Sequence, residues 1–398
     1  MKKKKLFLLA SLAAALAMTS CSSFDEPAAL DGDGETLSRS GARDASVYTE
    51  AQLRDALDFG LTEITIGDNI SLSDSLKLDY AVTINGTSGK KLTTTAPIVC
   101  TANASFNNLT IDATTGRGVG AISMNEEDIT VVLDGVTLTQ NTTGTSDTEA
   151  TIGVAIQNRV CNNSLKIRNS NISLPGNYVR GVNMRPMESN NQWVNIEVIN
   201  STITCGTVAN LGFPSTYSRC LSFTHVKCDN AKIDHSTLQG AYYVVNVNGD
   251  SEVTANVINN SVLDGRAGFN VWSTGFVGNV TNSTIIGHNN YAGPTESFAN
   301  IVICNTAENC KLNLTDATFK MDVNTEGQTN SQYAVSFRAS NQTMTLAGNL
   351  DIYTTAANNV GTSFFSANQG VGNISIDQKG LESFMVYTVS PEDIYKLP

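Results

Sequence analysis

The feature that most constrains the fold is a short phrase that recurs along the chain. It reads EVINSTI at residues 197–203, KIDHSTL at 232–238 and VINNSVL at 257–263. Shorter versions of the phrase begin near residue 108 and continue to residue 319, with separations of 22 to 35 residues. Self-similarity at such a period predicts a solenoid or a propeller.

A second phrase alternates with the first and consists of an apolar, a small polar and an apolar residue. Examples are Val182-Asn183-Met184, Leu221-Ser222-Phe223 and Val245-Asn246-Val247. Each repeat therefore offers three short runs with the period of two that strands require, and no helical segment separates them. The pattern predicts an all-β fold, a single parallel β-helix with three sheets.

One column of the first phrase consists of residues that tolerate a tight corner. Its members are Asn169, Asn200, Asn260 and Asn282, with His235 and Asp316 as substitutes. A corner between two strands needs positive φ, which Asn adopts more readily than most residues. Stacked Asn side chains are also expected to hydrogen-bond from coil to coil.

With this column the sequence resembles the pectate-lyase-like β-helix superfamily over roughly residues 60–376. The resemblance implies a right-handed parallel β-helix with an asparagine ladder and says little about chemistry. Residues 48–86 resemble the start of the adhesive, non-catalytic domains of that superfamily. Here Thr49 and Gln52 predict a capping box, and Leu53, Ala56 and Leu57 give a short helix an apolar face that closes the first coil.

The first residues predict export and lipidation. Residues 2–5 are lysines, residues 6–18 are uncharged, and Met18-Thr19-Ser20-Cys21 resembles a bacterial lipobox. We expect residues 1–20 to be a lipoprotein signal peptide, residues 21–46 an acylated Cys21 with a flexible tether, and residues 47–398 the β-helix with its end caps. The predicted location is the bacterial outer membrane, and Asp25 and Glu26 resemble a tag for its outer face.

Charge and cysteine content narrow the partners. Cleavage before Cys21 removes four lysines and no acid, leaving 21 basic and 37 acidic residues and a net charge of −16. Such a charge disfavours nucleic acid as a partner, so the membrane is expected to be reached through the lipid. Seven cysteines follow Cys21, and disulfides at Cys220–Cys228 and Cys304–Cys310 stand as an alternative to buried thiols.

The sequence shows no catalytic or metal-binding motif. Enzymes of the resembled superfamily use clustered carboxylates, but here Lys166, Glu197 and Lys232 follow one another in successive repeats, as cross-strand pairs would. No cofactor and no metal site are expected. The absence of clustered carboxylates favours a non-catalytic protein over an enzyme. If it is an atypical polysaccharide lyase or hydrolase, Arg266 or Arg185 is the candidate base.

Loop lengths predict a binding surface. Segments 205–219 and 287–298 are long, whereas 239–243 and 264–268 are short, which would leave a trough across the coils. Aromatic and amide side chains there suit sugar rings. The predicted ligand-binding residues are Tyr217, Tyr242, Asn246, Arg266, Asn270, Trp272, His288 and Tyr291.

The function expected from the sequence is that of a non-catalytic cell-envelope lipoprotein that binds glycan or adheres to a surface. Two alternatives remain, the enzyme just named and a structural spacer in the envelope. The alternative for the trough is a purely structural role, in which its aromatic side chains only cover the edges of the core.

Overall fold

The structure is a computed structural model, and it describes residues 44–158, 161–186, 192–206, 217–289, 298–323, 332–355, 365–367, 371–390, 393, 394 and 396. The chain divides into two units, residues 1–42 and 43–398. All described residues belong to the second unit. The predicted signal peptide and Cys21 lie outside them.

Sheet 1 contains the first strand of each coil, and all its pairings are parallel. Its separate strands are β2 (Glu63–Ile66), β5 (Val82–Gly86), β8 (Ala104–Asn107), β11 (Thr130–Asp134), β14 (Asn163–Arg168), β17 (Val194–Ile199), β20 (Lys227–Asp234) and β22 (Glu252–Ile258). β1 (Asp44–Val47) pairs with β2 and so begins inside the range 21–46 that was assigned to the tether.

Sheets 2 and 3 follow in each coil in the same parallel manner. Sheet 2 contains β3 (Ile70–Leu72), β6 (Lys91–Thr94), β9 (Thr110–Ala113), β12 (Thr137–Gln140), β15 (Asn171–Leu174) and β18 (Thr202–Cys205). Sheet 3 contains β4 (Leu76–Leu78), β7 (Ile98–Cys100), β10 (Gly120–Met124), β13 (Thr151–Asn158), β16 (Val179–Pro186), β19 (Arg219–Thr224), β25 (Phe298–Ile303), β27 (Gln332–Phe337) and β29 (Phe365–Ala367).

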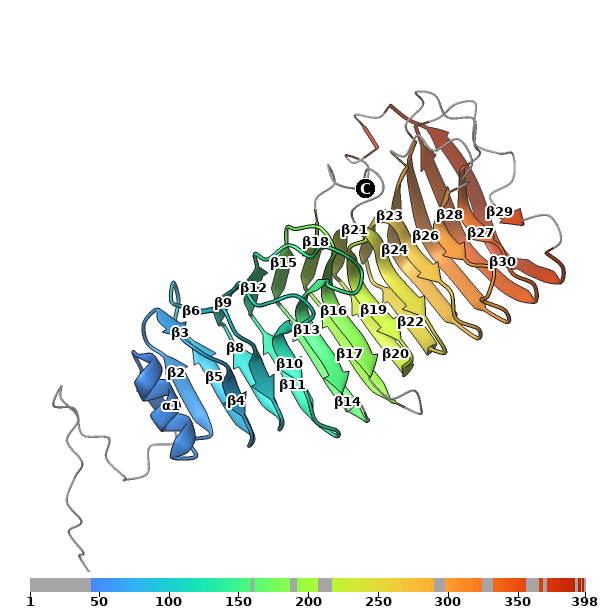
Figure 1. Ribbon diagram of the computed structural model, residues 1–398. Coiled ribbons are helices and arrows are strands. Elements are labelled where there is room, and N and C mark those ends of the chain that lie inside the picture. Colours follow the sequence, from blue (N-terminus) through green and yellow to red (C-terminus); the bar gives the residue numbers. More distant parts are fainter. Residues whose placement is uncertain are drawn as a thin grey trace, which may run out of the picture. The chain divides into compact units, whose positions relative to one another are not determined.

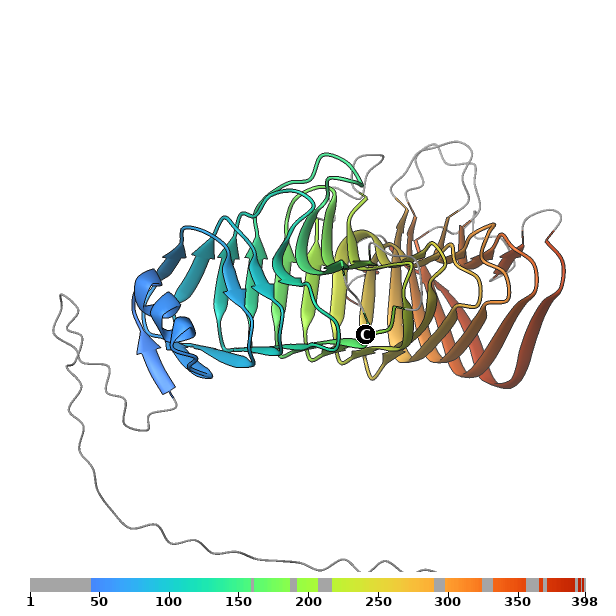
Figure 2. The same cartoon turned by 60° about the horizontal axis from the view of Figure 1, so that its bottom comes forward.

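Later strands run through a corner without a break. β21 (Thr237–Asn248) and β23 (Val262–Val271) each belong to sheets 2 and 3, because they pair with both. The strands that span sheets 1 and 2 are β24 (Val277–Asn289), β26 (Lys311–Val323), β28 (Gln342–Thr354) and β30 (Ile374–Thr388). The coils stack in chain order, as Figures 1 and 2 show from two directions. The prediction of an all-β, three-sheet parallel β-helix is confirmed.

A short helix, α1 (Glu50–Asp58), lies at the N-terminal end of the stack (Figure 1). Thr49 caps it, since its side chain accepts a hydrogen bond from the Gln52 amide, and Gln52 Oε1 accepts one from the Tyr48 amide at 2.8 Å. The predicted capping box is thus met in part: Thr49 caps the helix as expected, while Gln52 reaches the amide of the residue before the cap. Leu53, Ala56 and Leu57 are buried, so the helix covers apolar side chains that the first coil would otherwise expose.

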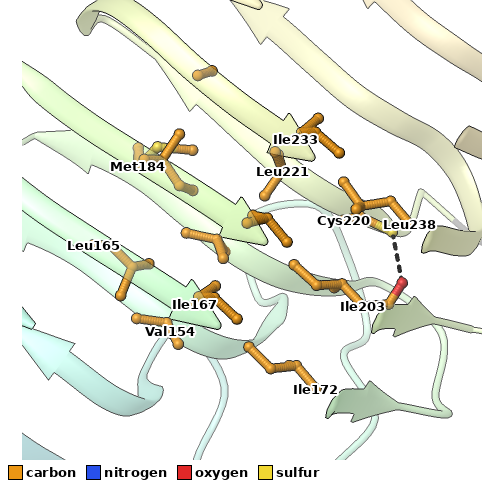
Figure 3. Close-up of a cluster of buried hydrophobic side chains, with 14 of the residues drawn as sticks. Val154, Leu165, Ile167, Ile172, Met184, Ile203, Cys220, Leu221, Ile233 and Leu238 are labelled. Atoms are coloured by element: carbon orange, nitrogen blue, oxygen red, sulfur yellow. Dashed lines mark hydrogen bonds between the residues drawn. The ribbon is translucent and has the colours of Figure 1, made fainter. Parts of the chain in front are cut away.

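The core is a column of apolar side chains from all three sheets. Figure 3 shows Leu165 and Ile167 from sheet 1, Ile172 and Ile203 from sheet 2, and Met184 from sheet 3 pointing toward one another. All five are fully buried. Burial of each such side chain contributes about 1.5–3 kcal/mol, and stacked coils add to it one layer at a time.

The corner between sheets 1 and 2 has the predicted backbone. Asn169 and Asn200 both have φ of 49°, His235 has 48° and Asp316 has 48°. The expected ladder of hydrogen bonds between these asparagine side chains is wrong, however. Their side chains are exposed, and Nδ2 of Asn169 donates instead to Oδ1 of Asp134 at 2.8 Å. The ladder belongs to the next residue in the phrase: the amide of Ser170 donates to Oγ of Ser201 at 3.1 Å, and the amide of Ser201 to Oγ of Ser236 at 3.1 Å.

Charged side chains on sheet 1 are in the expected register, with Glu197 between Lys166 and Lys232. The ion pair of Glu197 is made by Arg168, at 2.8 Å. Each of the seven described cysteines is a free thiol. Burial raises the pKa of Cys100 to about 12, which makes its thiol unreactive. No described helix has the length and apolar character needed to cross a membrane.

From β10 onward sheet 3 differs from the other two sheets because both of its faces are buried, whereas the outward residues of β4 and β7 are exposed or half-buried. On sheet 1, β14 alternates buried and half-buried residues, as a strand with one solvent-facing side does. On sheet 3 every residue of β10 is buried, as are the first five of β19. The outer face of sheet 3 therefore holds side chains that a β-helix ordinarily presents to water, and many of them are polar.

Candidate functional site

Three of the predicted ligand-binding residues form a stack along the corner between sheets 2 and 3. The rings of Tyr217 and Tyr242 are 5.2 Å apart, and the Arg266 guanidinium lies over the Tyr242 ring at 4.3 Å from its centroid. Tyr178 extends the stack at 6.2 Å from Tyr217. Tyr242 and Arg266 are only 4% and 3% exposed, so they are not the open floor of a trough. The expectation of an exposed floor is wrong for these two residues.

His288 is also buried, and it joins two carboxylates on neighbouring coils. Its Nε2 contacts Oδ1 of Asp264, and its Nδ1 lies 3.7 Å from Oδ2 of Asp322. Burial alone would lower the pKa of His288, but the hydrogen bonds to Asp264 and Asp322 raise it by more, to about 9. The imidazolium therefore offsets one of the two negative charges, and the cluster ties coils together.

Asn246 and Asn270 lie where the register predicts, on the outer side of sheet 3. Nδ2 of Asn270 donates to Oδ1 of Asn246 at 2.8 Å, and both residues are at most 2% exposed. The row continues through Ser222 to Asn183, one residue in each coil. The amide row predicted from the repeat is present, but it is buried and not presented to solvent.

Among the predicted residues that the structure describes, Trp272 is the one that is exposed, at 41%. It follows the last residue of β23, up to about 20 Å along the strand from Arg266, at the corner between sheets 3 and 1. Its backbone is fixed, because its amide donates to the Val247 carbonyl at 2.8 Å and its carbonyl accepts from Thr306 Oγ1 at 2.6 Å. The predicted set is thus split between two corners. Tyr291 lies outside the residues that the structure describes.

The Trp272 side chain borders an open hollow of about 810 Å³. Around it are three acids, one amide and three hydroxyl groups, from Asp229, Asp250, Glu252, Asn248, Thr254, Thr274 and Thr306. Lys227 neutralises Glu252 through an ion pair of 2.8 Å. An indole face beside hydrogen-bonding groups of both kinds is suited to a sugar ring, which has an apolar C–H face and a hydroxyl edge.

A second tryptophan at the same corner was missed from the sequence. Trp193 directly precedes β17, is 37% exposed and stacks under Lys227 Nζ at 5.9 Å. The chain has two tryptophans, and both are exposed where sheet 3 passes into sheet 1. The repeat pattern could have identified this residue. One Trp directly follows a sheet 3 strand and the other directly precedes a sheet 1 strand, so both fall at the same corner of the coil.

A second hollow, of about 510 Å³, lies over sheet 3 itself. Its lining includes Asp147, Arg180, Asn183, Arg185 and His225. It adjoins the Trp272 hollow, because the Asp250 amide donates to Nδ1 of His225 at 3.4 Å. In the part of the chain that the structure describes, no group of three or more His, Cys, Asp or Glu side chains is arranged to hold a metal ion.

The fold and these two hollows define a parallel β-helix protein with an aromatic, polar surface at one corner. No family model and no curated protein matches the chain. Among solved structures it is similar to the Dettilon tailspike protein, with 13% identity and a TM-score of 0.43 over 86% of this chain. The match covers 64% of the tailspike chain, so this chain spans less than two thirds of that protein.

Proposed function

We propose that this protein is a non-catalytic glycan-binding protein of the bacterial cell surface. The observation that carries the proposal is the exposure of both tryptophans at one corner. Trp272 borders a hollow of about 810 Å³, and Trp193 stacks on Lys227, the ion-pair partner of Glu252 in the lining of that hollow. Large exposed aromatic residues are costly in water, and their gathering at one place is typical of a binding surface. Sugar rings stack on such faces while their hydroxyl groups bind amides and carboxylates.

The geometry supports binding more than catalysis. The acids around Trp272 include Glu252, which is paired with Lys227, while the more buried acids Asp264 and Asp322 are engaged by His288. A glycosidase needs one carboxyl group held protonated near a second that is ionised. Among the described residues the closely paired acids lie beside cations, which favour the ionised form of both.

Replacing Trp272 with alanine is expected to weaken glycan binding by about 1–2 kcal/mol and to leave the melting temperature nearly unchanged, because the indole is half exposed. Wild type and variant would be compared on a glycan array, followed by titration of the best ligand. Phe59→Ala is the matched control, since Phe59 is 72% exposed beside α1 and far from the hollow in sequence. Unchanged binding in Trp272→Ala, or no glycan bound by the wild type, would refute the proposal.

The anchor is part of the same proposal. Acylation of Cys21 would hold the β-helix at the outer membrane, since several acyl chains on one residue give stable attachment. Cys21→Ser is expected to move the protein from the membrane fraction to the aqueous phase of a detergent partition. Cys161→Ser, which changes a free thiol within the β-helix, should leave it in the membrane fraction. Retention of Cys21→Ser in the membrane would show that the anchor is something else.

A further inference from the structure

An unusual pair of arginines lies at the hollow over sheet 3, and one of them, Arg180, lines it. Arg180 of β16 and Arg219 of β19 are in register on adjacent strands. Their side chains are 5% and 9% exposed, although they lie on the outer side of the β-helix. Two guanidinium groups side by side and out of water repel each other and lose hydration, so they require counter-charge.

Within the described ranges of the chain, one carboxylate supplies that counter-charge. Oδ1 of Asp147 lies 3.0 Å from Nη2 of Arg180 and 3.1 Å from Nη2 of Arg219. Nη1 of Arg180 donates to Asn183 Oδ1 at 2.8 Å, which is a neutral partner. One positive charge of the pair is therefore left over, and Arg185 adds another at the rim of the hollow.

The shifts in pKa agree with this imbalance. Burial raises the pKa of Asp147, but Arg219 and Arg180 lower it by more, so its carboxyl group stays ionised. Burial, followed by repulsion from Arg180, lowers the pKa of Arg219 despite the presence of Asp147. A second anion in the hollow would relieve both the desolvation and the repulsion.

Hydrogen-bond donors in the same place are unused. Nε of Arg180 and Nε of Arg219 are buried without a partner in the part of the chain that the structure describes. The same holds for Oγ of Ser218, next to Arg219, and Oγ of Ser222, next to Asn183 in register. Buried polar groups are nearly always paired in proteins, so a concentration of unpaired ones points to a missing ligand.

Asp147 itself is placed so that it can leave. Its side chain is 49% exposed, on the connection between β12 and β13. Neighbouring residues hold this connection with their own contacts, as the amide of Glu149 donates to Ser146 Oγ at 3.1 Å. The backbone carbonyl of Asp147 also accepts from Nη2 of Arg180 at 2.7 Å, so the carboxylate alone can rotate into water while the turn around it stays formed.

We propose that this hollow binds the anionic group of a glycan, a carboxylate or a sulfate ester, which displaces Asp147 from Arg180 and Arg219. A guanidinium presents paired donors that match two oxygens of such a group. The chain has a net charge of −12, so acidic glycans are repelled elsewhere and selected here. Only the assignment of the anion to a glycan rests on the proposed function; the anion site stands on the arginine pair.

The test uses the full-length chain and removes the internal competitor with Asp147→Ala. Melting temperatures of wild type and variant are measured in sodium chloride, sodium glucuronate and sodium sulfate at equal ionic strength, with glucose as the neutral sugar. In chloride the variant should melt below wild type, because the arginines lose the carboxylate that they share. Glucuronate or sulfate should restore the melting temperature, and titration should show at least about tenfold tighter binding than in wild type.

Two further variants complete the test. Glu149→Ala removes the same charge from the same connection and should respond to either anion no more than wild type does. Arg185→Gln changes an exposed residue of the hollow, so it should fold normally and bind glucuronate more weakly than wild type.

Rescue by glucuronate alone assigns a carboxylate, and rescue by sulfate alone assigns a sulfate ester. Equal responses in all three salts, or the same response in Asp147→Ala and Glu149→Ala, would overturn the proposal. Trp272→Ala should keep the full response to the anion. An anion response without any glycan binding would therefore refute the proposed function and leave the anion site intact.

Discussion

Replacing His288 with glutamine is expected to lower the free energy of unfolding by about 3 kcal/mol at pH 6, with almost no effect above pH 9. The imidazolium lies between Asp264 and Asp322 on neighbouring coils and has no exposed surface of its own. Removing one member of a buried ion cluster leaves the others uncompensated, which typically costs about 3–5 kcal/mol. Glutamine keeps the size and polarity of the side chain but cannot carry the charge.

The pH dependence follows from the raised pKa. In the unfolded chain a histidine loses its proton near pH 6.5, whereas in the folded protein His288 keeps it up to about pH 9. The stabilisation is therefore complete below pH 6.5 and is lost as the pH rises toward 9. A difference of about 2.5 pH units corresponds to about 3 kcal/mol.

Denaturant unfolding at pH 6, 7, 8 and 9 measures this difference. His235→Asn is the matched control, because His235 also contacts an aspartate but has a side chain that is 54% exposed. Asparagine tolerates the φ of 48° at that corner, so little change is expected at any pH. An equal loss in His288→Gln at pH 6 and pH 9 would show that the histidine contributes by packing and not by charge.

Replacing Ser201 with alanine is expected to lower the free energy of unfolding by about 1–3 kcal/mol. Oγ of Ser201 accepts from the Ser170 amide at 3.1 Å and donates to the Ile199 carbonyl at 2.7 Å. Both partners are backbone groups at a buried corner, and alanine would leave the amide without an acceptor. The same arrangement joins Ser236 to Ser261 and Ser261 to Ser283, so the loss interrupts a ladder.

Denaturant unfolding again gives the measurement, and the neighbouring corner residue gives the control. Asn200→Gly keeps a residue that adopts positive φ and alters a side chain that is exposed. It should change the stability by only a few tenths of a kcal/mol. If Asn200→Gly lowers the free energy of unfolding more than Ser201→Ala does, the asparagine column and not the serine column stabilises the corner.

The corner between sheets 1 and 2 shows how much of the structure the sequence repeat alone could predict. The repeated phrase predicted where φ becomes positive, because few residue types tolerate that conformation. It did not predict which side chain makes the hydrogen bonds. Asn200 and Ser201 are adjacent and both polar, and only the direction of the chain at the corner decides that Ser201 points inward and Asn200 into water.

The candidate site shows the same division. Trp272 was selected from loop lengths and is exposed, whereas Tyr242 and Arg266 were selected on the same grounds and are buried against each other. The acids that contact His288 were missed because Asp264 and Asp322 stand two coils apart on either side of it. Their meeting depends on coil stacking, which brings together residues that are distant in sequence.

The sequence by itself determined the three-strand coil, the parallel stacking, the corner positions and the capping helix. These follow from local rules, namely the period of two in strands, the steric limits on φ and the capping of a helix terminus. Only the tertiary structure decided that the outer face of sheet 3 is buried, that Arg180 and Arg219 share Asp147, and that both tryptophans occupy one corner. Exposure and charge pairing depend on what lies across the fold, and a repeat pattern carries no information about that.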